Sequence, residues 1–189
     1  MRIGILMLAA GQSRRFGSDK RTAQLPSGNT LLRQSLQNAL GSGLPVAVCV
    51  RPGEESLATA HGAQALVCTE ADLGMGHSLA QGIVQLPPWD AVLIALADMP
   101  EIQPATFCTI ARAIMPETIC QPMYHERPGH PVGFSKHFFP ALTALRGDVG
   151  ARRVIEQQAA ALIKIPLDDP GIVRDIDTPA DLPPRPLST

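Results

Sequence analysis

The residues best suited to chemistry lie in a glycine-rich, basic segment near the start of the chain. This segment runs from Leu8 to Lys20 and reads LAAGQSRRFGSDK. Gly11 and Gly17 permit backbone turns that other residues avoid, and they let main-chain N–H groups approach a ligand. Arg15 and Lys20 can place positive charge on phosphate oxygens, arginine as a fork and lysine as a point charge. The segment therefore favours phosphate binding, although a surface loop of solvated charges would have the same composition.

An apolar run directly before this segment predicts a strand that is buried on both faces. Residues 3–8 read IGILML, without the alternation of a half-exposed strand. In an open parallel sheet, ligands bind beyond the carboxyl ends of the strands. We therefore expect the glycine-rich segment to lie at the ligand-binding edge of a sheet.

Three carboxylates elsewhere are candidates for holding a divalent metal ion. Asp98 directly follows an apolar strand predicted over residues 91–97, where packing does not explain it, although it could cap the next turn. Asp175 and Asp177 are two residues apart, so in an extended segment their side chains point the same way. Magnesium on a nucleotide typically binds one or two carboxylates together with phosphate oxygens. One of the two later aspartates could complete such a site while the other caps the helix starting near Pro179.

The glycine-rich segment lacks both of the best-known phosphate-loop patterns, the G-x-G-x-x-G fingerprint and the Walker motif. It resembles instead the signature L-A-A-G-x-S-x-R-x-G-x-x-K of the nucleotidyltransferases that activate molybdenum cofactor and sugar phosphates. Ala9-Ala10-Gly11 is more similar to the molybdenum cofactor cytidylyltransferases than to the guanylyltransferases, which tend to carry a second glycine at the position of Ala10.

Downstream segments resemble the same family, so the similarity runs from Leu8 to Asp181. Residues 74–79, GMGHSL, resemble its base-recognition loop, and residues 129–132, GHPV, resemble a segment that contributes to the acceptor side. Residues 147–152, GDVGAR, match a further block. The chain departs from the family at Glu126, where a glycine is frequent, and after Lys20, where RTAQ replaces an apolar run.

The resemblance implies transfer of CMP from CTP to the phosphate of molybdenum cofactor (molybdopterin), with release of pyrophosphate. It implies Mg²⁺ as cofactor, with Mn²⁺ as an alternative, and a molybdoenzyme or its chaperone as a partner. The implied catalytic residues are Arg15, Lys20 and Asp98, and the implied metal ligands are Asp98 and Asp177, with Asp175 as a rival. The implied nucleotide-binding residues are Leu8, Ala9, Ala10, Gly11, Ser13, Arg15, Lys20, Gly74, Gly76 and Ser78.

Two residues are implied on the acceptor side, and each has a structural alternative. His130 could instead be a structural histidine, and Arg152 could be a surface charge. Three other functions stay open: a GTP-dependent or sugar-phosphate nucleotidyltransferase, a non-catalytic carrier of the cofactor, and a dinucleotide oxidoreductase. The oxidoreductase is the weakest alternative, because its glycine fingerprint and ribose-binding acid are missing.

Short apolar strands alternate with helices, which predicts a mostly parallel, twisted sheet with helices on both faces. We expect a single Rossmann-like α/β nucleotidyltransferase domain over residues 1–182 and a flexible tail over residues 183–189. The expected strands cover residues 3–8, 44–50, 65–69, 91–97, 118–122, 161–165 and 172–176. The expected helices cover residues 30–40, 54–61, 104–115, 136–145 and 148–160, with others opening at residues 74 and 179.

Composition excludes several other classes of protein. With 189 residues, a net charge of −1 and 4% aromatic residues, the chain is not suited to nucleic-acid binding. No apolar stretch approaches the roughly 20 residues that span a membrane. The four cysteines, Cys49, Cys68, Cys108 and Cys120, lie in apolar segments without C-x-x-C spacing, which favours reduced thiols in a cytoplasmic protein. Reading the first residues as a secretion signal would remove the buried strand, so we reject it.

Overall fold

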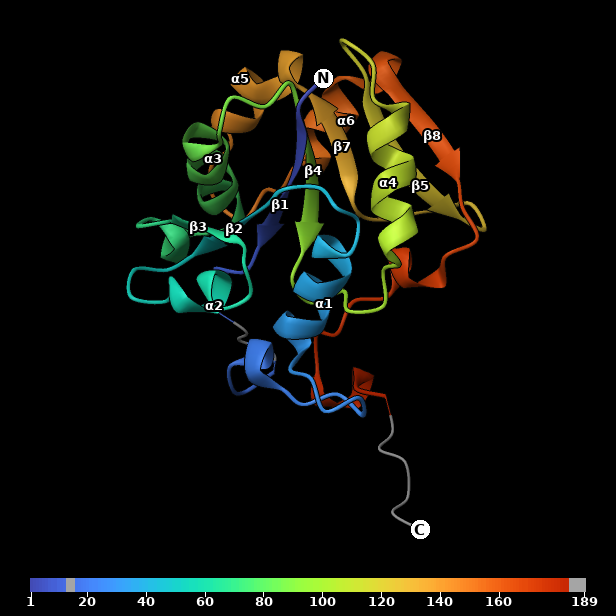
Figure 1. Cartoon of the computed structure of the whole chain (residues 1–189). Helices are drawn as coiled ribbons and strands as arrows, with labels where there is room; N and C mark the ends of the chain where they lie inside the picture. The colour runs from blue at the N-terminus through green and yellow to red at the C-terminus, as the bar shows by residue number, and fades with distance from the viewer. Residues whose placement is uncertain (13–15, 184–189) are drawn as a thin grey trace.

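The computed structural model describes residues 1–12 and 16–183, which form a mixed sheet between two layers of helices (Figure 1). The sheet has eight strands in the order β3-β2-β1-β4-β7-β5-β6, and β8 pairs with β5. The strands are β1 (Ile3–Leu8), β2 (Val46–Val50), β3 (Gln64–Val67), β4 (Ala91–Leu96), β5 (Ile119–Tyr124), β6 (Arg127–Pro128), β7 (Val132–Ser135) and β8 (Leu162–Pro166).

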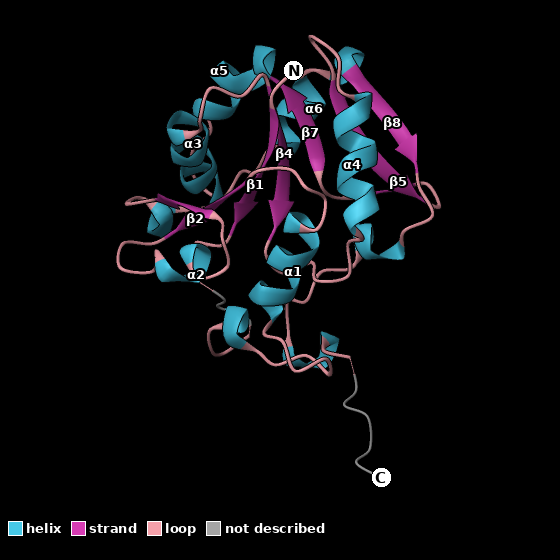
Figure 2. Ribbon diagram, in the orientation of Figure 1, coloured by secondary structure: helices cyan, strands magenta, loops and turns pink. Residues whose placement is uncertain are grey.

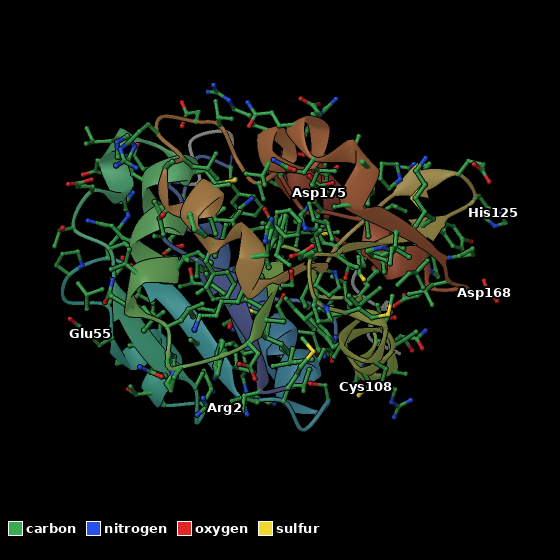
Figure 3. All side chains as sticks on the ribbon, turned by 90° about the horizontal axis from the view of Figure 1, so that it is seen from above. Arg2, Glu55, Cys108, His125, Asp168 and Asp175 are labelled. Carbon is green, nitrogen blue, oxygen red and sulfur yellow. The ribbon has the colours of Figure 1, made fainter. Side chains whose placement is uncertain are left out.

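Parallel pairing dominates the sheet, as the sequence predicts. Strands β3, β2, β1 and β4 run parallel to one another, and β8 runs parallel to β5. Strand β7 is antiparallel to both of its neighbours, β4 and β5. It follows a hairpin of β5 and β6 whose turn residues, His125 and Glu126, both have positive φ, a conformation that suits a two-residue hairpin turn. Figure 3 shows His125 at the tip of this hairpin.

Six α-helices cover the sheet (Figure 2): α1 (Leu31–Leu40), α2 (Ser56–Thr59), α3 (Met75–Gln85), α4 (Pro104–Ala113), α5 (Phe139–Thr143) and α6 (Arg152–Gln157), counted within the described residues. Short 3-10 helices connect them: η1 (Lys20–Thr22), η2 (Ala71–Leu73), η3 (Lys136–Phe138), η4 (Ala159–Ala161), η5 (Pro170–Val173) and η6 (Pro179–Asp181). No helix in this part of the chain is long and apolar enough to cross a membrane.

The two faces of the sheet bury separate halves of the core. Helices α1, α2 and α4 pack on one face, where β1 contributes Ile5 and Met7. Helices α3, α5 and α6 pack on the other face, where β1 contributes Leu6. Because successive strand residues point to opposite faces, an uninterrupted apolar strand serves both halves. Burial on both faces fixes β1 and β4, so the loops after these strands start from rigid positions.

The late part of the chain departs from the expected pattern. The strand expected over residues 172–176 is wrong, because residues 170–173 form the 3-10 helix η5. Asp169 caps it by accepting a hydrogen bond from the Gly171 N–H at 3.0 Å, and Pro170 occupies the first turn, so the chain turns where apolar residues suggested extension. The helix expected over residues 148–160 shortens to α6, and the one near Pro179 is the single turn η6.

Candidate active site

A cavity of about 510 Å³ opens at the carboxyl edge of the parallel strands. In Figure 1 the arrowheads of β1 and β4 point towards this edge, where the segment after β1 meets the C-terminal segment. The residues that line the cavity come from the loops after β1, β3 and β4 and from two later segments: Leu8, Ala9, Ala10, Gly11, Gln12, Lys20, Arg21, Leu31, Ala71, Asp72, Gly74, Met75, Ser78, Leu96, Ala97, Asp98, Asp148 and Asp177.

Lys20 joins the two predicted metal-binding carboxylates at this cavity. Its Nζ donates to Asp98 Oδ2 at 2.6 Å and to Asp177 Oδ1 at 3.0 Å, and it lies 3.3 Å from the Ile176 carbonyl oxygen. Burial alone would lower the pKa of the Lys20 ammonium, but the two carboxylates outweigh burial, and the pKa is raised. Lys20 is therefore a permanent cation at neutral pH.

Asp177 reaches this cluster because the neighbouring Ile176 is fixed on both sides. The Ile176 N–H donates to the main-chain oxygen of Asp98 at 2.9 Å, and the Ile176 side chain is buried against Leu25 and Leu31. Asp175 is exposed and does not line the cavity. Of the two aspartates that the sequence left as rivals, only Asp177 is brought to Lys20 and Asp98.

The carboxylate pair suits a hard divalent cation. Asp98 Oδ1 is buried and has no hydrogen-bond partner within the described residues, so it retains an unused lone pair beside the cavity. Among residues 1–12 and 16–183, no group of three or more His, Cys, Asp or Glu side chains could hold a metal ion. A cation at Asp98 and Asp177 would therefore complete its shell with water and substrate oxygens, which is the pattern usual for magnesium on nucleotides.

Two arginines that the sequence did not single out as site residues hold the backbone of the loop after β1. Arg21 Nη1 donates to the Ala9 carbonyl at 2.9 Å, and Arg51 Nε donates to the Ala10 carbonyl at 2.9 Å. Arg21 is 9% exposed and also binds Glu54 and Asp19, with donor–acceptor distances from 2.6 to 2.8 Å. Its guanidinium lowers the pKa of both carboxyls.

The signal for Arg21 was its departure from the apolar run that usually follows the signature lysine. No pattern in the sequence pointed to Arg51, because its contact with the loop joins segments that follow two different strands.

The glycines of the segment GMGHSL are explained by close packing against a second loop. Gly74 has φ +119°, and a Cβ atom there would lie 2.4 Å from the carbonyl carbon of Gly147. The Gly76 N–H donates to the Gly147 carbonyl at 2.8 Å, and the Gly147 N–H donates to His77 Nδ1 at 3.0 Å. Gly74 and Ser78 line the cavity, whereas Gly76 does not. The two resembling segments, 74–79 and 147–152, therefore form one joined wall.

The remaining predicted site residues lie apart from the cavity or outside the described residues. The His130 side chain is half-buried and its Nδ1 has no partner in the described part of the chain. Burial lowers the His130 pKa, although a hydrogen bond with the Ile94 backbone and the negative charge of Asp98 act in the opposite direction. Arg152 is exposed, with Nε 2.7 Å from Glu156 on the next turn. Ser13 and Arg15 lie outside the described residues.

Comparison with known proteins places this architecture in a family. Residues 5–162 match the MobA-like NTP transferase domain. The purine catabolism protein PucB of Bacillus subtilis (strain 168) is 32% identical over 193 residues, covering 95% of this chain and 93% of PucB. Nicotine blue oxidoreductase of Paenarthrobacter nicotinovorans is 26% identical, covering 92% of this chain and 91% of that protein.

A solved structure has the same fold. The manganese complex of Rv0371c from Mycobacterium tuberculosis H37Rv superposes with a TM-score of 0.77 at 25% identity, covering 96% of each chain. The family match covers most of the chain, including the strands that lead into the cavity. The chain therefore belongs to the MobA-like NTP transferase family and is a nucleotidyltransferase.

Proposed function

We propose that this nucleotidyltransferase transfers CMP from CTP to the phosphate of molybdopterin and releases pyrophosphate. The observation that carries the proposal is the cluster in which Lys20 Nζ joins Asp98 at 2.6 Å and Asp177 at 3.0 Å beside the cavity. The cluster supplies both charges that the reaction needs, a cation for phosphate oxygens and carboxylates for a divalent ion. The identity of the base and of the acceptor rests on the resemblance of the signature and of the segments at residues 74–79 and 129–132.

The residues after β1 would hold the triphosphate. Glycine at position 11 lets main-chain N–H groups approach phosphate oxygens, and Lys20 would neutralise charge that moves onto the leaving pyrophosphate. Arg15, which the family signature also implies, would share this task. Gly74 and Ser78 on the opposite wall would face the base, where backbone groups can read its edge.

The metal-binding residues would be Asp98 and Asp177. The orphaned Asp98 Oδ1 and the all-oxygen donor set fit Mg²⁺, and they also fit Mn²⁺, the metal named for the M. tuberculosis relative. A divalent ion bound there would polarise the α-phosphate and neutralise charge on the attacking and leaving oxygens.

The chain itself has little covalent work to do. A phosphate oxygen of the acceptor attacks the α-phosphorus of CTP in line, a new P–O bond forms, and the bond to pyrophosphate breaks. Lys20 and Asp98 act by position and charge, and the enclosing walls hold the two substrates in the attack geometry. His130 and Arg152 are proposed on the acceptor side from the resemblance alone, because neither lines the cavity.

Pyrophosphate release tests the proposal directly. Purified protein is mixed with CTP, GTP, ATP or UTP, with and without Mg²⁺, and with molybdopterin, a sugar phosphate or no acceptor. We expect release only with CTP, Mg²⁺ and molybdopterin together, and its loss in Lys20→Ala and Asp98→Ala while Arg174→Ala, in an exposed pair with Glu101, stays active.

Three results would redirect the proposal. Release with GTP or with a sugar phosphate would change the substrate but keep the reaction class. Binding of molybdopterin without release under any condition would favour a cofactor carrier. Near-normal turnover in either active-site variant would remove the role proposed for that residue.

A further inference from the structure

The loop after β1 has two peptide groups whose carbonyls are already bound by arginines. The Ala9 carbonyl accepts from Arg21 Nη1 and the Ala10 carbonyl accepts from Arg51 Nε, each at 2.9 Å. The Ala9 N–H is also used, because it donates to the Cys49 carbonyl of β2 at 3.1 Å. The start of the loop is thus hydrogen-bonded to the sheet, and the carbonyls of the next two peptides are hydrogen-bonded to the side chains of Arg21 and Arg51.

The second polar group of each of these two peptides is its N–H, which belongs to Ala10 in the first and to Gly11 in the second. In a planar trans peptide the N–H points opposite to the C=O, so the Ala10 and Gly11 N–H groups face away from the arginines that hold the carbonyls. Neither N–H has an acceptor within the described residues. Ala10 is 2% exposed, and a buried backbone N–H without a partner is rare in native proteins. Both residues line the cavity.

We propose that Arg21 and Arg51 are positioning residues that turn the Ala10 and Gly11 N–H groups towards an acceptor atom of the bound nucleoside triphosphate. This inference rests on the proposed function, since it needs a triphosphate in the cavity, but it does not depend on which base is chosen. The two arginines contact the loop rather than the reacting atoms.

Carboxylates hold both arginines in place. Glu54 accepts two hydrogen bonds from the Arg21 guanidinium, at 2.6 and 2.7 Å, and one from the main-chain N–H of Arg51 at 3.3 Å. Arg51 Nη2 forms an ion pair with Asp72 Oδ1 at 3.1 Å without a hydrogen bond in the described part of the chain, and Asp72 Oδ1 accepts a hydrogen bond from the Gln12 side chain. Loops after β1, β2 and β3 are therefore linked through side chains, so the peptide orientation is fixed before a ligand arrives.

Arg21 also links the loop to the reaction centre. It follows Lys20 directly in η1, and the two side chains diverge, Lys20 to Asp98 and Asp177 and Arg21 to the loop carbonyl. A rigid η1 would thus set the distance between the N–H groups and the carboxylate pair.

The test is nucleotide binding without acceptor. Calorimetric titration with CTP, GTP, ATP and UTP in Mg²⁺ compares the wild type with Arg51→Ala, Arg51→Lys and the surface control Arg174→Ala. Loss of oriented N–H groups should weaken binding of the preferred triphosphate about tenfold in Arg51→Ala, with partial recovery in Arg51→Lys, which keeps one donor. Arg21→Lys serves as the second variant, because complete removal of Arg21 would leave two carboxylates unpaired and endanger folding.

A second readout follows the loop itself. In protein labelled with 15N-glycine, the Gly11 amide signal should shift when the triphosphate binds, and this shift should shrink in Arg51→Ala. A purely structural role would lower the melting temperature and leave the dissociation constant below that temperature unchanged. Wild-type affinity in both Arg51→Ala and Arg21→Lys would overturn the inference. Preference for GTP would overturn only the proposed substrate, and absence of triphosphate binding by the wild type would overturn both.

Discussion

Replacing Lys20 by methionine should strengthen metal binding and abolish turnover in the same protein. Lys20→Met keeps an unbranched side chain as long as the aliphatic part of lysine and removes the ammonium that lies 2.6 Å from Asp98 and 3.0 Å from Asp177. The ammonium and a divalent cation would draw on the same carboxylates. We therefore expect the two to compete while no nucleotide is bound.

The size of this competition follows from charge and distance. A divalent ion about 4 Å from an ammonium is repelled by about 2 kcal/mol even at the dielectric constant of water, which corresponds to roughly 30-fold in the dissociation constant. The lysine can partly move aside, so about tenfold tighter Mn²⁺ binding is the expected result. Without metal, loss of the Lys20 ammonium from beside the two carboxylates should lower stability by about 1–3 kcal/mol, or about 2–12 °C for a domain of this size.

Mn²⁺ titration followed by electron paramagnetic resonance, with thermal melts at several Mn²⁺ concentrations, measures both effects. Lys20→Met should gain more stability from Mn²⁺ than the wild type does, while pyrophosphate release falls about 100-fold or more because a charged partner of the phosphates is lost. The double variant Lys20→Met, Asp98→Asn is the control and should not show the additional stabilisation by Mn²⁺. Unchanged Mn²⁺ affinity in Lys20→Met would refute the assignment of Asp98 and Asp177 as the metal site.

Three further predictions concern packing and pH. Gly74→Ala should cost at least about 1 kcal/mol and weaken triphosphate binding, because φ +119° and the facing backbone leave no room for Cβ; thermal melts and calorimetry check it. Hydrogen bonds from Arg21 lower the pKa values of Asp19 and Glu54 in the folded protein. The stability that these carboxylates contribute is therefore present above their unfolded pKa values and should be lost as pH falls through the folded ones. In Arg21→Lys, the free energy of unfolding from urea melts should depend less on pH between about pH 5 and 3. The lowered His130 pKa predicts stability lost as pH falls below 6.5, and His130→Gln should remove that dependence.

The sequence allowed the meeting of Lys20 and Asp98 at one edge of the sheet to be predicted, because one topological rule covers both residues. Lys20 follows β1 and Asp98 follows β4, and neighbouring parallel strands present their carboxyl ends at the same edge. From the residues alone, the second metal ligand could be narrowed only to Asp175 or Asp177, and the family resemblance favoured Asp177. Choosing between them depends on the burial of Ile176, a tertiary contact that the local spacing of two acids does not contain.

Other features depend on contacts between distant segments and were not predicted. The contacts of Arg21 and Arg51 with loop carbonyls join residues 12 and 41 positions apart, and no periodic pattern encodes them. Residues 172–176 looked like a strand by composition, but the cap at Asp169 turns the chain there. Arg152 fits a family block, yet it lies on an exposed face of α6 paired with Glu156, so its predicted role stays a proposal.

The proposed reaction centre can form only when nearly the whole chain has folded. Asp98 and Asp177 lie 78 and 157 positions after Lys20, and the hydrogen bond from the Ile176 N–H to the Asp98 carbonyl joins the last segment to the loop after β4. Long-range closure of this kind carries an entropy cost that only the packed sheet offsets. A damaged core should therefore release Asp177 before it disturbs β1, since the short segment with Asp177 depends on the buried Ile176 side chain and on a few hydrogen bonds, whereas β1 is paired along its length with two strands. If the proposed metal site is correct, we expect metal affinity to report folding at this edge more sensitively than the secondary-structure content of the sheet does.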